Sequence, residues 1–425
     1  MKALLRAVLP ALLAASPAGA IPNVVGGFIT ANDSALNGED LTAVVLADGP
    51  WTGDVPLPGE WRGEAPVAGV EYAYLLARPR IFGIPALLVQ TGRRDGVLDS
   101  LAITFADAGS YFGYYQPELP DGLSRRERQK RIEAALADRR EAFTAFYNET
   151  LEAVRKELGA LSGKRPREAD LGKTRALRTK VTDYRHGEFL LRLIACDDRL
   201  IRVVVSRGGQ PARSWLDAER GTMATGALAG HYAAQVATDE HGDTRIEIPV
   251  VPQGYKPYCG LNTLAMAARY FGLHLDEDQL AVAGRFPNTG TADGSQLPRL
   301  YLAVAKEARL DMRKANTFDP ATARSCLKAG LPVIVWRRFS HDRDRDHTRR
   351  TMAFPGPGSV SSPEPDPPGS WPGENAPLHA SVLVGYNDER REFLFLESWS
   401  RLGGPRRMHA NELTATAYLS FYFKP

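Results

Sequence analysis

The sequence predicts an α+β protein, in which a mainly β region with one long helix precedes a unit of helices followed by an antiparallel sheet. Two observations support this order. Residues 21–118 contain short alternating runs between glycine and proline turns, whereas residues 259–308 carry apolar side chains at helical spacing and 379–399 read as a hairpin. At 425 residues, with 44% hydrophobic and 24% charged residues, the chain is long enough for two or three domains.

The first 20 residues have the features of a secretory signal. Lys2 and Arg6 precede a short apolar run, and residues 18–20 form a small-x-small cleavage pattern. Removing Lys2 and Arg6 leaves 51 of the 53 basic residues against 50 acidic ones, a net charge of +1, which does not favour nucleic acid or an anionic membrane. No later apolar run reaches the roughly 18 residues of a membrane span. We therefore expect a periplasmic or secreted protein, without stable membrane insertion.

Residues 21–245 are predicted to form an accessory region rich in strands. The strands are expected at 42–46, 72–76, 86–89 and 101–105, with a hairpin over 186–207. A long amphipathic helix is expected at about 124–158, because Ser124 and Glu127 form a capping-box pattern before a helical apolar repeat. A helical signal at 215–234 and a linker at 239–243 complete this region.

The basic run from Arg125 to Arg131 opens the long helix. A nucleic-acid surface would need interleaved aromatic residues, which the run lacks, and the acidic Glu133 and Asp138 follow it. A solvated helix face is the better interpretation, so we expect no nucleic-acid partner. The alternative, nucleic-acid binding through this run, predicts steep salt dependence.

Residues 246–425 are predicted to form one α+β domain. Helices are expected at 259–271, 276–282 and 297–308 and through Cys326, followed by a buried strand at 332–336 and a hairpin at 379–386 and 393–399. Residues 340–378 read as an inserted loop without a rigid element. Its metal-capable run from His341 to His347 is interleaved with arginines, which oppose a cation, so we expect neither a metal nor a cofactor. The Pro/Gly/Ser run 355–377 could act as a lid.

Cys259 is the candidate nucleophile. It opens the apolar pattern of helix 259–271, and the N–H groups and dipole at a helix N-terminus stabilise a thiolate. Gln253, six residues upstream, could donate to the oxyanion that forms when a thiolate attacks a carbonyl group.

Four stretches carry a family resemblance: Gln253 before Tyr258-Cys259-Gly260, the run GLPVIV at 330–335, HASVLVGYND beginning at His379, and FLESWS around Glu397. Together they resemble a papain-like cysteine peptidase, closest to the bacterial C39-like peptidase domains. The resemblance covers about residues 248–425 and implies a papain-like fold that acts on a peptide or protein substrate.

The resemblance also implies roles for individual residues. Cys259 would be the nucleophile, His379 its base, Gln253 part of the oxyanion hole, and Glu397 the orienter of His379. The family usually has Asn or Asp where this chain has Glu397, so Asn387 and Asp388 are alternative orienters. The cathepsin signature of a second cysteine and an aromatic residue after the nucleophile is absent.

The primary functional hypothesis is a cysteine peptidase that acts through a Cys259 acyl-thioester. The alternatives are a catalytically degenerate peptidase fold that serves as a binding module, and an acyltransferase that uses the same Cys259–His379 dyad. The odd number of cysteines fits one reactive thiol, and it leaves a disulfide between Cys196 and Cys326 open.

Overall fold

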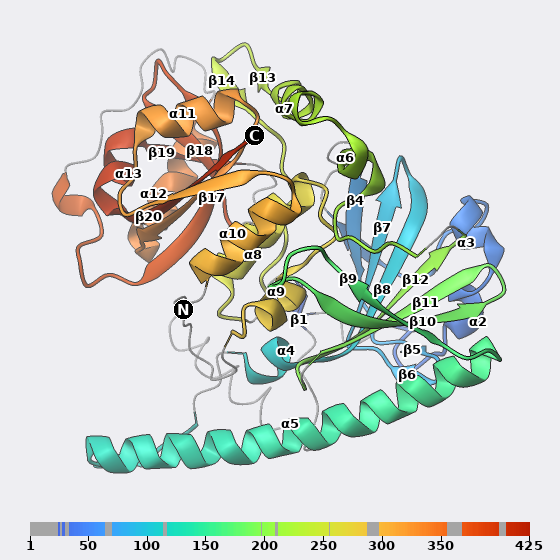
Figure 1. Ribbon diagram of the computed structural model, residues 1–425. Coiled ribbons are helices and arrows are strands. Elements are labelled where there is room, and N and C mark those ends of the chain that lie inside the picture. Colours follow the sequence, from blue (N-terminus) through green and yellow to red (C-terminus); the bar gives the residue numbers. More distant parts are fainter. Residues whose placement is uncertain are drawn as a thin grey trace.

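Two eight-stranded sheets organise the computed structural model (Figure 1). The structure describes residues 34–63, 70–113, 117–196, 198–208, 211–254, 256–286, 297–354, 368–398 and 405–425, together with the backbone of the short strands β1 (Val24–Val25) and β2 (Phe28–Ile29). The signal predicted for residues 1–20 lies outside the described residues. Within the described residues, no helix combines the length and apolarity that crossing a membrane requires.

The first sheet belongs to the N-terminal region. Its strand order is β3-β4-β7-β8-β12-β11-β10-β9, so β8, before the long helix, pairs with β12, after it. The strands are β3 (Trp61–Gly63), β4 (Val70–Leu75), β7 (Leu88–Arg94), β8 (Val97–Asp107), β9 (Arg167–Leu171), β10 (Thr179–His186), β11 (Phe189–Cys196) and β12 (Leu200–Arg207). The strands predicted at 72–76, 86–89 and 101–105 and the hairpin at 186–207 are thereby confirmed, with shifted ends.

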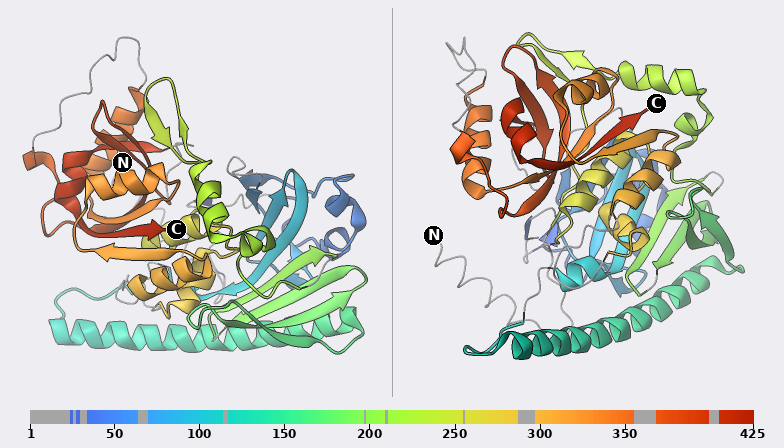
Figure 2. Two further views of the ribbon diagram at one scale, coloured as in Figure 1. Left: turned by 45° about the horizontal axis from the view of Figure 1, so that its top comes forward. Right: turned by 60° about the vertical axis from the view of Figure 1, so that its left-hand side comes forward.

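Helix α5 (Arg125–Ser162) lies along one face of this sheet (Figures 1 and 2). It begins with the predicted capping box, in which the Ser124 hydroxyl accepts from the Glu127 N–H and the Glu127 carboxylate accepts from the Ser124 N–H. Its buried stripe, which includes Phe143 and Val154, packs with one side of β11 and β12 in a common apolar core. The helix thus covers one face of the sheet, and its basic first turns are exposed.

The short elements of the N-terminal region include one prediction that is wrong. Residues 42–46, predicted as a strand, form helix α2 (Thr42–Val45), because the Asp40 carboxylate accepts from both the N–H and the hydroxyl of Thr42 and starts a turn. The other short elements are α3 (Asp48–Thr52), β5 (Arg80–Ile81), β6 (Ile84–Pro85), α4 (Ala108–Phe112), α6 (Ala218–Thr222) and α7 (Thr225–Ala233).

The second sheet forms the centre of the C-terminal part. It runs β13-β14-β17-β16-β20-β15, with β18 pairing β17 and β19 pairing β18. Its strands are β13 (Ala237–Thr238), β14 (Asp243–Arg245), β15 (Asp311–Ala315), β16 (Val333–Arg338), β17 (Leu378–Asn387), β18 (Glu392–Leu396), β19 (Arg406–His409) and β20 (Ala417–Lys424). The predicted strand 332–336 and hairpin are confirmed, whereas the segment predicted as a linker connects β13 to β14 within this sheet.

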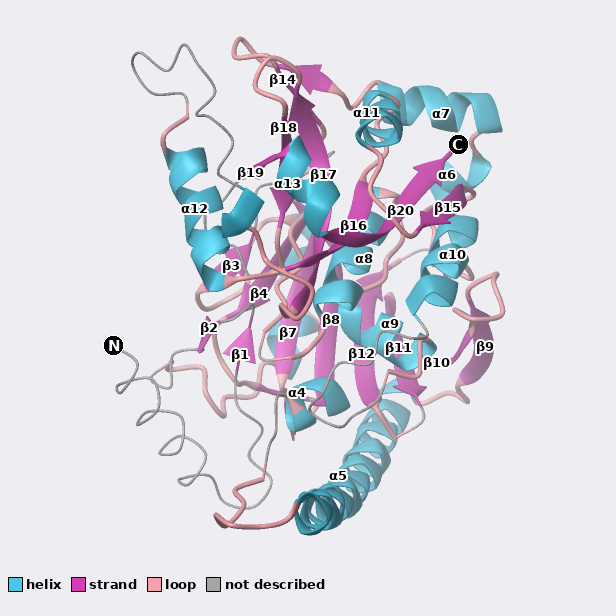
Figure 3. Ribbon diagram, turned by 90° about the vertical axis from the view of Figure 1, so that its left-hand side faces the viewer, coloured by secondary structure: helices cyan, strands magenta, loops and turns pink. Residues whose placement is uncertain are grey.

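The helices of the C-terminal part lie against this sheet and between it and the first sheet (Figures 1 and 3). They are α8 (Cys259–Tyr270), α9 (Glu277–Ala283), α10 (Leu297–Glu307), α11 (Pro320–Lys328), α12 (His341–Met352), the 3-10 turn η1 (Pro368–Ser370) and α13 (Ala410–Thr416). Helix α8 is buried along nearly its whole length, in a core that also includes Leu171 and Ile194 of the first sheet. Both sheets therefore contribute side chains to the apolar core that contains α8.

Helix α12 contradicts the prediction that residues 340–378 lack a rigid element. Ser340 caps the helix, and Arg343 and His347 both reach Glu412 of α13 across a buried ion-pair cluster. A charged run thus becomes a helix, because one side of it finds buried partners. Residues 355–367, most of the predicted flexible loop, lie outside the described residues.

Candidate active site

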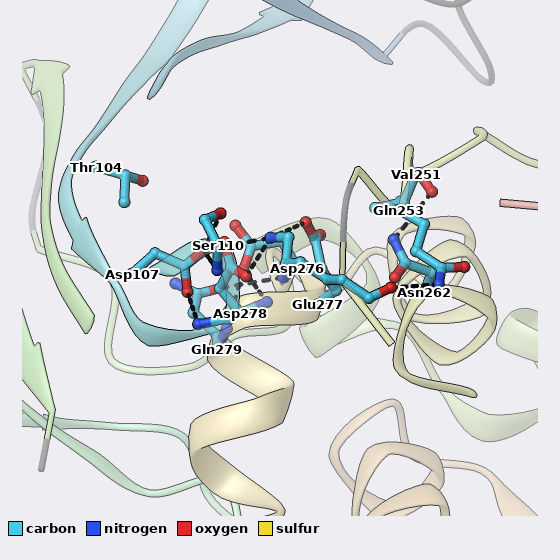
Figure 4. Close-up of polar contacts among 12 residues, drawn as sticks. Thr104, Asp107, Ser110, Val251, Gln253, Asn262, Asp276, Glu277, Asp278 and Gln279 are labelled. Atoms are coloured by element: carbon cyan, nitrogen blue, oxygen red, sulfur yellow. Dashed lines mark hydrogen bonds and ion pairs between the residues drawn. The ribbon is translucent and has the colours of Figure 1, made fainter. Parts of the chain in front are cut away.

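Cys259 is the first residue of α8, as the sequence predicts. Gly254 turns the preceding loop with a φ of 64°, and the Asn262 side chain donates to the Val251 carbonyl over 3.1 Å, which ties the loop to the first turn of the helix (Figure 4). The Cys259 thiol is partly buried at the helix N-terminus, where the unpaired N–H groups favour a negative charge.

His379 lies near the start of β17, which packs against α8. The Cys259 thiol and the His379 ring are hydrogen-bonded, and the backbone N–H groups of Ala380 and Gly260 also donate to the sulfur. Burial by itself raises the pKa of Cys259, but these donors and the His379 charge outweigh it, so that the pKa of the thiol is lowered. The chain separates the two residues by 120 positions, and the packing of α8 on β17 brings them together.

Glu397 completes a hydrogen-bonded chain with Cys259 and His379. His379 Nε2 contacts Glu397 Oε2, which leaves Nδ1 as the ring nitrogen that faces the thiol. Burial lowers the pKa of His379, but the charge of Glu397 and the contact with Cys259 raise it overall. Burial likewise raises the pKa of Glu397, but His379, Arg337 and Arg406 outweigh this and bring it to about 2. The carboxylate is therefore ionised at neutral pH and favours an imidazolium ring.

The two alternative orienters lie elsewhere. Asn387, at the other end of β17, donates to the His241 carbonyl over 3.0 Å and to Asp243 over 2.8 Å. Asp388 is 3.5 Å from Arg324 on α11. The side chain that contacts His379 is consequently Glu397.

Sequence reasoning missed the residues that hold Glu397. Arg337 Nη2 donates to Glu397 over 2.7 Å, Ser381 Oγ donates over 2.8 Å, and Arg406 Nη2 lies 3.7 Å away. Arg337 directly follows the buried apolar run of β16 and is only 2% exposed. A charged residue at that point of a buried strand is the signal that could have revealed a buried carboxylate partner.

Gln253 is held by the loop around it and by the residue that follows Glu397. Its Oε1 accepts from Ser398 Oγ over 2.7 Å, its backbone N–H donates to the Ser398 carbonyl over 3.0 Å, and its Nε2 donates to the Lys256 carbonyl over 2.5 Å. The buried Gln253 is thus fixed beside the end of β18, with its side-chain amide held by the Lys256 carbonyl and by Ser398.

The two remaining cysteines and the metal-capable run at residues 341–347 were the other candidate sites in the sequence. No disulfide joins Cys196 and Cys326, and burial raises the pKa of Cys326 to about 11, which makes it an unreactive thiol. His347 lies 3.0 Å from Glu412 in an ion-pair cluster. In the part of the chain that the structure describes, no group of three or more His, Cys, Asp and Glu side chains is placed to hold a metal ion.

Comparison with known proteins shows which family the C-terminal part resembles. Residues 245–424 match the model of the Peptidase_C39 like family. Two solved structures are similar, each at 14% identity with a TM-score of 0.25 and 40% of this chain covered: the peptidase domain of Streptococcus ComA, a bifunctional ABC transporter of a quorum-sensing pathway (92% of that chain covered), and a C39-like peptidase from Bacillus anthracis (90% covered). No curated protein matches the chain in sequence.

Proposed function

Since residues 245–424 form a C39-like peptidase domain, we propose that this protein is a cysteine peptidase that cleaves peptide bonds through an acyl-thioester on Cys259. The family and the mixed helix and antiparallel sheet fold point to a cysteine peptidase type of function. The observation that carries the proposal is the chain of hydrogen bonds from Cys259 to His379 to Glu397.

In the proposed reaction, the Cys259 thiolate attacks the carbonyl carbon of the scissile peptide bond. A sulfur–carbon bond forms, and the carbonyl π electrons move to the oxygen, which becomes an oxyanion. When the oxyanion collapses, the carbon–nitrogen bond breaks, and the leaving amine takes the proton of the His379 imidazolium. His379 then accepts a proton from a water molecule that attacks the thioester, and it returns that proton to the Cys259 sulfur as the carboxylic acid product leaves.

The oxyanion needs donors that are in place before it forms. We assign these to the backbone N–H of Cys259 and to the side-chain amide of Gln253, which the Lys256 carbonyl and Ser398 hold in place. Glu397 keeps the His379 ring in one orientation and favours its protonated form, while Arg337 and Ser381 hold Glu397.

The proposal is tested by measuring the rate at which iodoacetamide alkylates Cys259 as a function of pH. We expect fast alkylation near neutral pH, with Cys326 unreactive, and slower alkylation in a His379→Ala variant. If the pKa of Cys259 lies near the ordinary cysteine value of about 8.5, the Cys259–His379 dyad is ruled out. The alternative function, a binding module on a peptidase scaffold, would then stand. Release of a free acid rather than an amide of an added amine separates hydrolysis from acyl transfer.

We further propose that the protein works outside the cytoplasm, with residues 1–20 as a cleaved signal, 21–245 as an accessory region and 246–425 as the peptidase domain. The basic start, the short apolar run and the cleavage pattern of the first 20 residues support this division. Sequencing the N-terminus of the protein recovered from the periplasm or medium tests it, and Ile21 is the expected first residue.

A further inference from the structure

A corner of the N-terminal region reaches the loop that leads to Cys259. This β8–α4 corner, residues 107–112, contains the end of β8 and helix α4. Asp107 Oδ2 lies 3.5 Å from Lys256 Nζ, although the two residues are 149 positions apart. Both side chains are buried, at 4% and 5% exposure, so this ion pair is shielded from water.

Lys256 is also held by the start of α9. Its Nζ lies 2.5 Å from Asp278 Oδ1 and 3.1 Å from Glu277 Oε1, so with Asp107 three carboxylates surround one ammonium group. Figure 4 labels these three carboxylates. Arg202 of β12 pairs with the second carboxylate oxygen of Asp278, Oδ2, over 3.3 Å. Burial lowers the pKa of Lys256, but the carboxylates outweigh it and raise it, which keeps the lysine charged. The cluster therefore fixes the Lys256 side chain between the two parts of the protein.

Gly109 in the same corner packs directly on Tyr258, the residue before Cys259. A Cβ atom at position 109 would lie 2.5 Å from the Tyr258 hydroxyl and 2.8 Å from two of its ring carbons. Tyr258 is itself only 3% exposed and contacts Phe286 edge-to-face. The close approach leaves no room for a side chain at position 109. The corner therefore packs tightly against the ring of Tyr258.

The backbone of Lys256 continues this contact into the candidate active site, because its carbonyl accepts the Gln253 amide over 2.5 Å. We propose that Asp107 and Gly109 are positioning residues, which brace Lys256 and Tyr258 so that Gln253 and Cys259 keep their catalytic places. The N-terminal region then completes the peptidase site. This inference rests on the proposed function.

The first test is Asp107→Asn, with Asp99→Asn as the control. The asparagine side chain loses the charge of Asp107 and the bond that Oδ2 accepts from the Ser110 N–H, but it keeps the Oδ1 that accepts from the Gly109 N–H. Asp99 is an exposed acid on the same strand. Two probes report on the full-length protein. Iodoacetamide alkylates the Cys259 thiolate without forming an oxyanion, whereas 4-nitrophenyl acetate transfers its acetyl group to the sulfur through an oxyanion and releases 4-nitrophenolate.

We expect Asp107→Asn to slow acetylation about 10-fold while alkylation stays within about 2-fold, since a small displacement of Gln253 affects only the oxyanion. Asp99→Asn should change neither rate. A merely structural role for Asp107 would lower both rates together or neither, and either result overturns the assignment of Asp107 to positioning.

The second test is Gly109→Ala, with Gly159→Ala in helix α5 as the matched control. No atom lies within 4 Å of a Cβ at position 159, so an alanine there fits freely, whereas an alanine at position 109 must displace Tyr258. We expect Gly109→Ala to reduce both alkylation and acetylation at least 10-fold, because Cys259 follows Tyr258 directly. Equal rates in the two alanine variants would show that the corner does not hold the loop.

Amide hydrogen exchange tests, independently of catalysis, whether Asp107 and Gly109 hold the loop before Cys259 in place. Amides of residues 256–262 should exchange faster in Asp107→Asn and Gly109→Ala than in the two controls, while those of the α5 core keep their protection. Unchanged exchange overturns the inference even in an active protein. If the thiol of the unaltered protein proves ordinary, the proposed function fails, and faster exchange still supports the contact.

Discussion

Replacing Glu397 with glutamine tests the electrostatic core of the proposed mechanism. Glutamine keeps the size of the side chain but removes the negative charge from a site with no exposure. Two opposite charges about 4 Å apart at an effective dielectric constant of about 20 attract each other by about 4 kcal/mol. Arg337, 2.7 Å away, and Arg406 share the charge of Glu397, so His379 receives only part of this energy.

We assign about one third to two thirds of this attraction energy to the pair of Glu397 and His379. That energy corresponds to about a 10- to 100-fold change in the protonation equilibrium of His379. In Glu397→Gln the imidazolium loses this stabilisation, and the pKa of Cys259 rises because its thiolate forms together with that imidazolium. We therefore expect alkylation by iodoacetamide at pH 7 to slow by about 10- to 100-fold, with the pH profile displaced upward.

The matched control is Glu412→Gln. Glu412 is also buried and also pairs with a histidine and an arginine, His347 at 3.0 Å and Arg343 at 2.5 Å, but it lies on α13. Both variants should unfold at lower denaturant concentration, because each removes a buried carboxylate that pairs with a buried arginine. Only Glu397→Gln should displace the alkylation profile. If the two variants show the same profile as the unaltered protein, Glu397 does not set the state of His379, and the reasoning fails.

Three further predictions follow from other contacts. Gln253→Ala should slow acetylation by 4-nitrophenyl acetate about 10²- to 10³-fold while alkylation of Cys259 changes little; equal losses would exclude Gln253 from the oxyanion hole. Ser124→Ala should lower the free energy of unfolding by about 1 kcal/mol in urea titrations, through loss of the capping box, and an unchanged midpoint would contradict it. Glu397 and Glu412 have folded pKa values of about 2 against 4.5 when unfolded, so the unfolded state binds more protons in this range. Stability should fall as the pH drops from about 4.5 to about 2, by about 3 kcal/mol for each group, and proton uptake on unfolding measured by calorimetry at several pH values checks the sign.

The local patterns that predicted the fold correctly are those in which a segment buries one face. Three patterns predict their element within a few residues: the capping box at Ser124, the helical repeat of α5 and the apolar run of β16. The prediction at residues 42–46 is wrong because a single carboxylate, Asp40, outweighs the β propensity of the run. The helix at 341–352 was missed because its buried partner, Glu412, is about 70 residues downstream.

The candidate nucleophile, its base and the glutamine upstream can be predicted from the sequence alone, because a thiol at a helix start and the short motifs of the family resemblance are each read within a few residues. Only the tertiary structure chose Glu397 over Asn387 and Asp388, since the pairing of β17 with β18 decides which side chain faces His379. It also placed Arg337, Lys256 and the β8–α4 corner around the site. Buried charges need partners, and distant parts of the chain supply those partners only once it has folded.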